Sequence, residues 1–152
     1  MGQQTSQQMD TTLDAPPRTA NAPPLQSGGE IDESRLAAVA QAEYAGRRRR
    51  DGLFPSGIFA EPAWDMLLDL YIQEHLKRPV SIHSLCIAAA VPPTTALRWI
   101  GRLVDCGLMT REPSQRDNRV VHVALTATGR SEMVQYLRSR LASNDAGQTR
   151  GG

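Results

Sequence analysis

Apolar side chains follow a helical period most clearly in the middle of the chain, over residues 62–76. They recur there at intervals of three and four residues, the spacing that places side chains on one face of a helix. Pro62 suits the first helical turn, where its missing N–H group has no helical partner to lose. The repeating positions are Trp64, Leu67, Leu68, Tyr71 and Ile72. This pattern predicts the main core helix of the chain.

The pattern before this helix is weaker. Residues 31–45 carry a narrow apolar stripe with acidic residues at its start, which predicts a modest helix that ends at Gly46. A connector punctuated by Gly and Pro follows, and we expect its large apolar side chains to dock on the core. These side chains are Leu53, Phe54, Ile58 and Phe59.

Short helical and β-branched segments alternate after the core helix. The predicted elements are a brief strand at 78–82, helices at 83–91 and 94–106, strands at 108–112 and 119–125, and a short helix from 126 to 141. Pro93 directly precedes the helix predicted at 94–106, and Gly107 caps the C-terminus of that helix. Thr126 can cap the last helix. This order predicts a mostly helical α+β fold, a winged helix-turn-helix with a two- to three-stranded antiparallel β-wing.

The distribution of apolar residues also predicts the domain organisation. The first thirty residues are rich in Gln, Thr, Pro, Ala and Gly and cannot offset the entropy of ordering. The predicted segments are a disordered tail at 1–30, an N-terminal helix with an arginine run at 31–50, a winged-helix DNA-binding domain at 51–141 and a disordered tail at 142–152.

Composition limits the class of protein. The 152 residues with 40% hydrophobic content support one core, and no window approaches the roughly 20 apolar residues of a membrane helix. Without a signal peptide, the chain is expected to stay in the cytoplasm. The two cysteines, Cys86 and Cys106, fit a reducing compartment, and we expect Cys106 to be a buried or half-buried inert thiol.

The net charge of +1 does not by itself indicate a nucleic-acid binder, so the placement of the basic residues matters more. Lys77 is the single lysine among 17 basic residues. The planar guanidinium of arginine suits phosphates and guanine edges, although a codon bias toward arginine would produce the same excess.

The predicted helix at 94–106 has two opposite faces. A helical wheel places the apolar residues Ala96, Leu97, Ile100, Leu103 and Val104 in one arc. The opposite arc carries Thr94, Thr95, Arg98, Gly101, Arg102 and Asp105. Such a face fits a major groove about 12 Å wide, where arginine reaches guanine and threonine meets phosphate or a thymine methyl. The alternative is an ordinary solvated helix face.

Three further features of this helix bear on that choice. A start at two prolines leaves no good side-chain cap, so the first N–H groups remain available to a DNA phosphate or to water. Trp99 lies on the flank, where we expect it to cover the edge of the core. Gly101 lies in mid-helix at the edge of the outward arc, either because another backbone approaches closely there or as a tolerated defect.

The loop between the last two strands places Arg116 and Arg119 around Asp117. An aspartate between two guanidiniums can orient one of them by a charge-assisted hydrogen bond while the other projects from the tip. A tip arginine of this kind can enter a narrow minor groove, where the potential is most negative. Taken alone, the loop would be interpreted as a solvated polar turn.

Residues 60–137 resemble the recognition helix and wing of MarR-type winged-helix transcriptional regulators. The matching positions are the hydroxyl pair Thr94 and Thr95, Arg98, Leu103 and Val104 before Gly107 and Leu108, Asp117 and Arg119, and Leu125, Thr126 and Gly129. The resemblance implies a regulator that binds specific double-stranded DNA, commonly as a homodimer, and releases it on binding a small ligand, here an unknown effector.

Carried over by position, the resemblance implies that Thr94, Thr95 and Arg98 contact the major groove and Arg119 the minor groove, with Asp117 positioning that arginine. Two features depart from the family. Its members usually dimerise through long terminal helices, whereas the sequence predicts short ones, and Asn118 stands where they often carry a second arginine.

The consecutive arginines Arg47, Arg48, Arg49 and Arg50 could contact DNA phosphates or form a solvated linker. No phosphate-binding loop, nucleophile–base pair or complete metal-ligand set is recognisable, so we expect no enzyme, no cofactor and no metal. The rival to DNA binding is a winged helix that docks its arginine–threonine face on an acidic protein partner.

Overall fold

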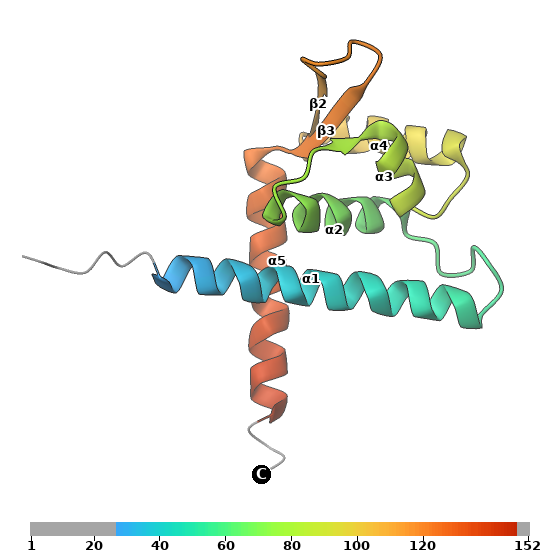
Figure 1. Ribbon diagram of the computed structural model, residues 1–152. Helices are drawn as coiled ribbons and strands as arrows, with labels where there is room; N and C mark the ends of the chain where they lie inside the picture. The colour runs from blue at the N-terminus through green and yellow to red at the C-terminus, as the bar shows by residue number, and fades with distance from the viewer. Residues whose placement is uncertain (1–26, 149–152) are drawn as a thin grey trace, which may run out of the picture.

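The computed structural model describes residues 27–148 (Figure 1). Its elements are α1 (Ser27–Leu53), α2 (Pro62–His75), β1 (Val80–Ser81), α3 (Ile82–Ala88), α4 (Pro93–Asp105), β2 (Met109–Pro113), β3 (Val121–Leu125) and α5 (Ala127–Gln148). The predicted order of elements is therefore confirmed, and with it the mostly helical winged helix-turn-helix.

The three strands form one antiparallel sheet in the order β1-β3-β2. The short β1 pairs Val80 with Val123, and β2 pairs with β3 along its whole length, from Met109 opposite Leu125 to Pro113 opposite Val121. The β2–β3 hairpin extends away from the helices and forms the wing (Figure 1).

Two hydrophobic clusters hold the fold together, and α2 contributes to both. One face of α2 supplies Met66 and Leu70 to a cluster with α3, α4 and the sheet. The other face supplies Leu68, Tyr71 and Ile72 to a cluster with α1 and α5. In Figure 1, α2 accordingly lies between α1 and the wing, and α5 crosses both α1 and α2.

Local signals set the ends of the helices in the winged helix-turn-helix motif. The Ser81 hydroxyl accepts a hydrogen bond from the Ser84 N–H and caps α3, and the Thr126 hydroxyl accepts one from the Gly129 N–H and caps α5. Gly107 follows α4 with a φ of 72°, the left-handed conformation that glycine adopts at low cost. The predicted caps at Gly107 and Thr126 are confirmed.

Both terminal helices are longer than the sequence pattern predicts. Helix α1 does not end at Gly46, and it includes residues 27–30, which were expected to be disordered. It continues because its last turns are tied to α2, where the Asp65 carboxylate accepts hydrogen bonds from Arg47 and Arg48. A helix that is already nucleated extends at little cost when tertiary contacts support it.

Helix α5 likewise continues past residue 141 to Gln148, into the segment expected to be a disordered tail. An ion pair with α1 supports this extension, since Arg35 contacts Asp145 at 2.9 Å. The predicted disorder of residues 1–26 and 149–152 lies outside the described residues.

The connector between α1 and α2 does not dock on the core, so that prediction is wrong. Leu53 and Ile58 are 81% and 63% exposed, and Phe54 and Phe59 are exposed as well. Because α1 continues to Leu53, the connector lies beyond the N-terminal end of α2. The two phenylalanine rings instead pack edge to face on each other, with centroids 5.3 Å apart.

The cysteines are both free, and the expectation for Cys106 is wrong. Cys106 follows the last turn of α4 and is exposed, whereas Cys86 is half-buried, and burial raises the pKa of its thiol. The C-terminal turn of α4 lies at the edge of the core, so an apolar helical pattern did not guarantee burial at its last position.

We expect Gly129→Ala to destabilise the protein by about 3 kcal/mol, because overpacking in a close contact typically costs 1–3 kcal/mol and occasionally more. A Cβ atom at Gly129 would overlap the backbone oxygen of Leu108. Gly147→Ala in the same helix is the matched control, because nothing lies within 4 Å of its added Cβ. Thermal unfolding checks both variants, and equal melting temperatures would contradict the prediction.

Candidate nucleic-acid interface

The apolar stripe of α4 is buried and its opposite face points outward. Ala96, Ile100 and Leu103 are buried against α2, α3 and the sheet. On the opposite face Thr94, Arg98 and Arg102 are exposed, and Thr95 is half-buried at its edge. Packing of three side chains therefore presents hydroxyls and guanidiniums to solvent along one line.

Leu97 does not join this buried stripe, which corrects its assignment to the apolar arc. It is 47% exposed and lines a groove of about 610 Å³ between α3, the start of α4 and β3. Ile87 of α3 and Arg119 of the wing line the same groove. The helical wheel placed Leu97 at the margin of the arc, and only the position of the neighbouring elements decided on which side it lies.

Trp99 occupies the other flank of α4. Its ring packs against the first cluster, as expected, and the Arg102 guanidinium lies over it at 4.8 Å from the ring centroid. A cation over an indole face is held by the ring quadrupole. Arg102 is thus held against the flank of α4 by a residue one turn earlier.

The N-terminus of α4 has no side-chain cap. Pro92 occupies the N-cap position with an extended backbone and makes no capping hydrogen bond. Thr94 is exposed in the first turn. The first N–H groups and the positive end of the helix dipole therefore face outward beside the threonines.

Gly101 lies between Arg98 and Arg102 along the axis of α4, at the edge of its outward face. A Cβ atom placed on Gly101 would lie 3.9 Å from Nη2 of Arg111. Arg111 belongs to β2, and its exposed side chain reaches across to α4. The sequence analysis gave Arg111 no role, and the mid-helix glycine was the one signal of a close approach at this point.

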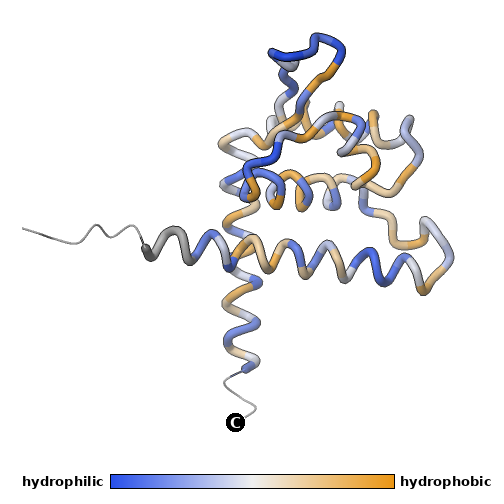
Figure 2. The backbone as a smooth tube through the Cα atoms, in the orientation of Figure 1, coloured by the Kyte–Doolittle hydropathy of each residue, from blue (hydrophilic) through white to orange (hydrophobic). Residues whose placement is uncertain are grey.

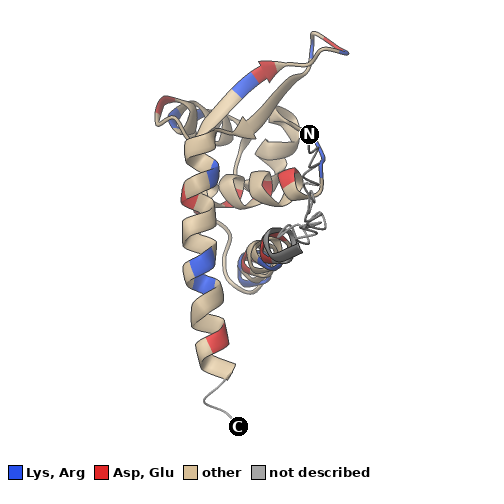
Figure 3. Cartoon of the chain, turned by 90° about the vertical axis from the view of Figure 1, so that its left-hand side faces the viewer, with Lys and Arg blue, Asp and Glu red and all other residues tan. Residues whose placement is uncertain are grey.

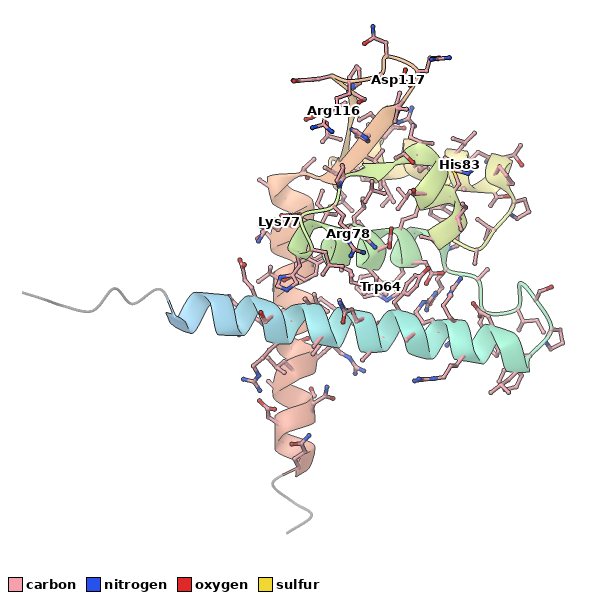
Figure 4. All side chains as sticks on the ribbon, viewed as in Figure 1. Trp64, Lys77, Arg78, His83, Arg116 and Asp117 are labelled. Atoms are coloured by element: carbon pink, nitrogen blue, oxygen red, sulfur yellow. The ribbon has the colours of Figure 1, made fainter. Side chains whose placement is uncertain are left out.

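The wing loop is organised by Ser114 and Asp117. The buried Ser114 hydroxyl accepts from the N–H groups of Arg116 and Asp117, and the Asp117 carboxylate accepts from the Arg119 N–H at 3.0 Å. Asp117 Oδ1 also lies 3.4 Å from Arg119 Nε. The loop is largely hydrophilic (Figure 2), carries both charges at its tip (Figure 3), and holds Arg116 and Asp117 away from the helices (Figure 4).

Arg119 therefore has a fixed backbone and an exposed side chain. Its side chain is 92% exposed, although its carboxylate partner lies two residues away. The Val120 carbonyl accepts from the Ser114 N–H at 2.8 Å and closes the loop. The guanidinium projects from a defined turn and is available to a ligand.

The arginine run lies elsewhere, in the C-terminal part of α1. Arg47 is buried and donates to the Asp65 carboxylate of α2 at 2.5 Å, and it also contacts Glu61. Arg48 Nη2 donates to the other Asp65 oxygen at 2.7 Å. Burial opposes the charge of Arg47, but the hydrogen bonds to Asp65 and Glu61 outweigh it and raise the pKa of Arg47.

These contacts give part of the run a structural role. Arg47 and Arg48 neutralise a carboxylate that is buried in the protein, so neither guanidinium projects freely toward a ligand. Arg50 lies over the Phe59 ring at 4.6 Å, and Arg49 is exposed. In Figure 1 the C-terminal turns of α1 lie on the opposite side of α2 from the wing, so the run does not adjoin α4's outward face.

The sequence-predicted residues thus separate into two groups. The residues of α4 and of the wing project from one winged helix-turn-helix motif, whereas Arg47 and Arg48 of the arginine run tie α1 to α2. Within residues 27–148, no three His, Cys, Asp or Glu side chains gather as a metal site would require. No helix in the same range is long and apolar enough to cross a membrane.

No protein-family model matches the chain, and no curated protein matches it. Solved structures do. RV1404 from Mycobacterium tuberculosis has 22% identity and a TM-score of 0.50, with 83% of this chain and 78% of that one covered. The likeness to RV1404, over about four-fifths of each chain, is one of fold.

Two other solved structures have slightly lower TM-scores. Transcriptional regulator Tm0710 from Thermotoga maritima has 21% identity and a TM-score of 0.49, with 82% of this chain and 80% of that one covered. S. aureus MepR in complex with DNA has 15% identity and a TM-score of 0.49, with 72% and 82% covered.

We expect Asp65→Asn to destabilise the protein by about 3 kcal/mol, because it removes the buried carboxylate to which both Arg47 and Arg48 donate and leaves the buried Arg47 charge with Glu61 alone. Asp32→Asn removes the carboxylate of an exposed ion pair between α1 and α5 and should cost under about 1 kcal/mol. Urea unfolding of both variants measures the difference. Similar midpoints would show that the Arg47–Asp65 pair does not hold α1 on α2.

Proposed function

We propose that the protein is a MarR-type DNA-binding transcriptional regulator that inserts α4 into the major groove and the wing into the adjacent minor groove. One observation carries the proposal: the outward face of α4, with its exposed arginines, stands beside a hairpin whose tip presents Arg119. The sequence resemblance to MarR-type regulators over residues 60–137 supports it. The protein acts by binding rather than by catalysis.

The proposed major-groove contacts follow from the geometry of α4. A helix fits the groove when its outward face lacks bulky apolar side chains, and each arginine can bond two acceptors of a guanine edge. Arg98 and Arg102 lie one turn apart on that face, and Thr94 and Thr95 lie at the N-terminal end. The arginines therefore read bases, and the threonines and free N–H groups meet a phosphate.

The proposed minor-groove contact is Arg119. A narrow minor groove concentrates negative potential and attracts an arginine that is already extended toward it. Asp117 restricts Arg119 by accepting from its backbone and its side chain. Arg116, exposed on the same loop, adds positive charge near the sugar–phosphate backbone.

We also propose that the regulator works as a homodimer in the cytoplasm. Helices α1 and α5 are both long, and the last turns of α5 are exposed along residues 142–148. A two-fold axis would pair these helices with their copies and place the two wings on successive turns of DNA. The bound site would then contain two inverted half-sites about one helical turn apart, roughly 34–36 Å.

We expect Arg98→Ala and Arg119→Ala to impair DNA binding in different ways. Selection of random duplexes at about 150 mM salt yields the preferred motif, because non-specific binding is weak there. Arg98→Ala should lose preference at one or two base pairs, at about 1–3 kcal/mol each. Arg119→Ala should weaken binding to all sequences more evenly.

Arg138→Ala is the control for these two variants, since Arg138 is an exposed arginine of α5 that pairs with Asp32 away from the wing. It should leave the motif unchanged. Affinity should fall log-linearly with salt for the wild type. A folded wild type that selects no motif and lacks salt-dependent duplex affinity would contradict DNA binding and favour an acidic protein partner for the same face.

We expect the double substitution Thr94→Glu and Thr95→Glu to reduce duplex affinity at least tenfold, because two carboxylates would repel a phosphate at the uncapped start of α4. Thr94→Gln with Thr95→Gln is the matched control without charge. Fluorescence anisotropy of a labelled duplex measures both. Undiminished binding by the glutamate variant would exclude a phosphate at this helix end.

A further inference from the structure

Arg111 of β2 lies against α4 at the one place on the outward face where α4 has no side chain of its own. We propose that Arg111 reads a base edge together with α4, and that Gly101 is present to admit its guanidinium. The inference rests on the proposed DNA-binding function and adds a reader from a second element. The recognition surface would then be composite, built from a helix and from the base of the wing.

The contact itself is specific. Nη2 of Arg111 lies 3.9 Å from the position of a Cβ atom on Gly101, which is ordinary van der Waals distance. An alanine would therefore fit at position 101, whereas a longer side chain would extend into the space of the guanidinium. Glycine is unfavourable in a helix interior, so its presence at this point has a physical reason if it leaves room for Arg111.

The guanidinium of Arg111 is free to bind a ligand. Within residues 27–148, the Arg111 side chain makes no hydrogen bond and no ion pair, although its backbone is fixed by pairing with Val123 of β3. Arg102, the next arginine along α4, is instead stacked on Trp99. Arg111 thus combines a rigid strand backbone, an exposed side chain and unused donors.

A base contact fits this position better than a phosphate contact. Gly101 lies along the axis of α4 between Arg98 and Arg102, at the edge of the outward face, so the Arg111 guanidinium stands beside the residues proposed to enter the major groove. Phosphates line the rims of the groove rather than its floor. Arginine at this position can bond both acceptors of a guanine, as proposed for Arg98.

The experiment compares position-resolved base preferences of the full chain with those of Arg111→Ala and Arg111→Lys, by sequencing duplexes bound in competition. Both variants should lose roughly tenfold preference at a base pair that Arg98→Ala leaves intact. Arg111→Lys keeps the charge but not the planar fork, so its salt dependence should match the wild type. Melting curves establish that each variant folds.

Two variants at Gly101 test the role of the glycine. Gly101→Ala should keep the preference at that base pair, and Gly101→Leu should erase it, as Arg111→Ala does. Loss at a different base pair in Gly101→Leu would overturn the role assigned to the glycine.

Two results would overturn base reading by Arg111. One is an unchanged motif in Arg111→Ala. The other is uniform weakening with a salt slope lower by about one, which indicates a phosphate contact. Both differ from failure of the proposed function, in which the wild type itself selects no motif.

Discussion

Burial of one stripe of α4 is the constraint on which the arrangement of this protein depends. Ala96 and Ile100 are completely buried, and Leu103 nearly so, in the cluster formed with α2, α3 and the sheet. Removing these side chains from water fixes the rotation of α4 about its own axis. The arginines on the opposite face then have one direction in which to project, and no charged contact is needed to aim them.

Helix α2 transmits this arrangement to the rest of the chain. Its two faces contribute to two clusters, so the winged helix-turn-helix motif and the pair α1 and α5 share one rigid element. The buried carboxylate of Asp65 adds a polar link, because Arg47 and Arg48 of α1 both donate to it. Such a link contributes little net stability but is costly to break, and it therefore fixes the position of α1 on α2.

The arginines of this protein consequently have two different roles. Those of α1 and α5 mostly form ion pairs with acidic side chains of neighbouring helices, which compensate their charge within the fold. Those of α4, β2 and the wing remain exposed with few acidic neighbours. This division explains how a chain of net charge +1 can present a basic surface. Positive and negative charges nearly balance over the whole chain, but they are distributed unevenly over its surface.

The sequence by itself determined the order of elements, the limits of α2 and α4 to within one or two residues, the cap at Gly107 and the hydroxyl cap at Thr126, because each follows from local periodicity or local hydrogen bonding. It also separated the two faces of α4, except at the margin, where Leu97 is exposed rather than buried.

Only the tertiary structure decided the length of α1 and α5, the exposure of the 53–59 connector and the burial of Arg47. It also decided the approach of Arg111 to Gly101. These depend on partners 10 to 110 positions away, such as Asp65 for Arg47 and Asp145 for Arg35, with separations of 18 and 110 residues. A periodic pattern reports which face of a segment is apolar, but it carries no information about which distant side chain will meet that face.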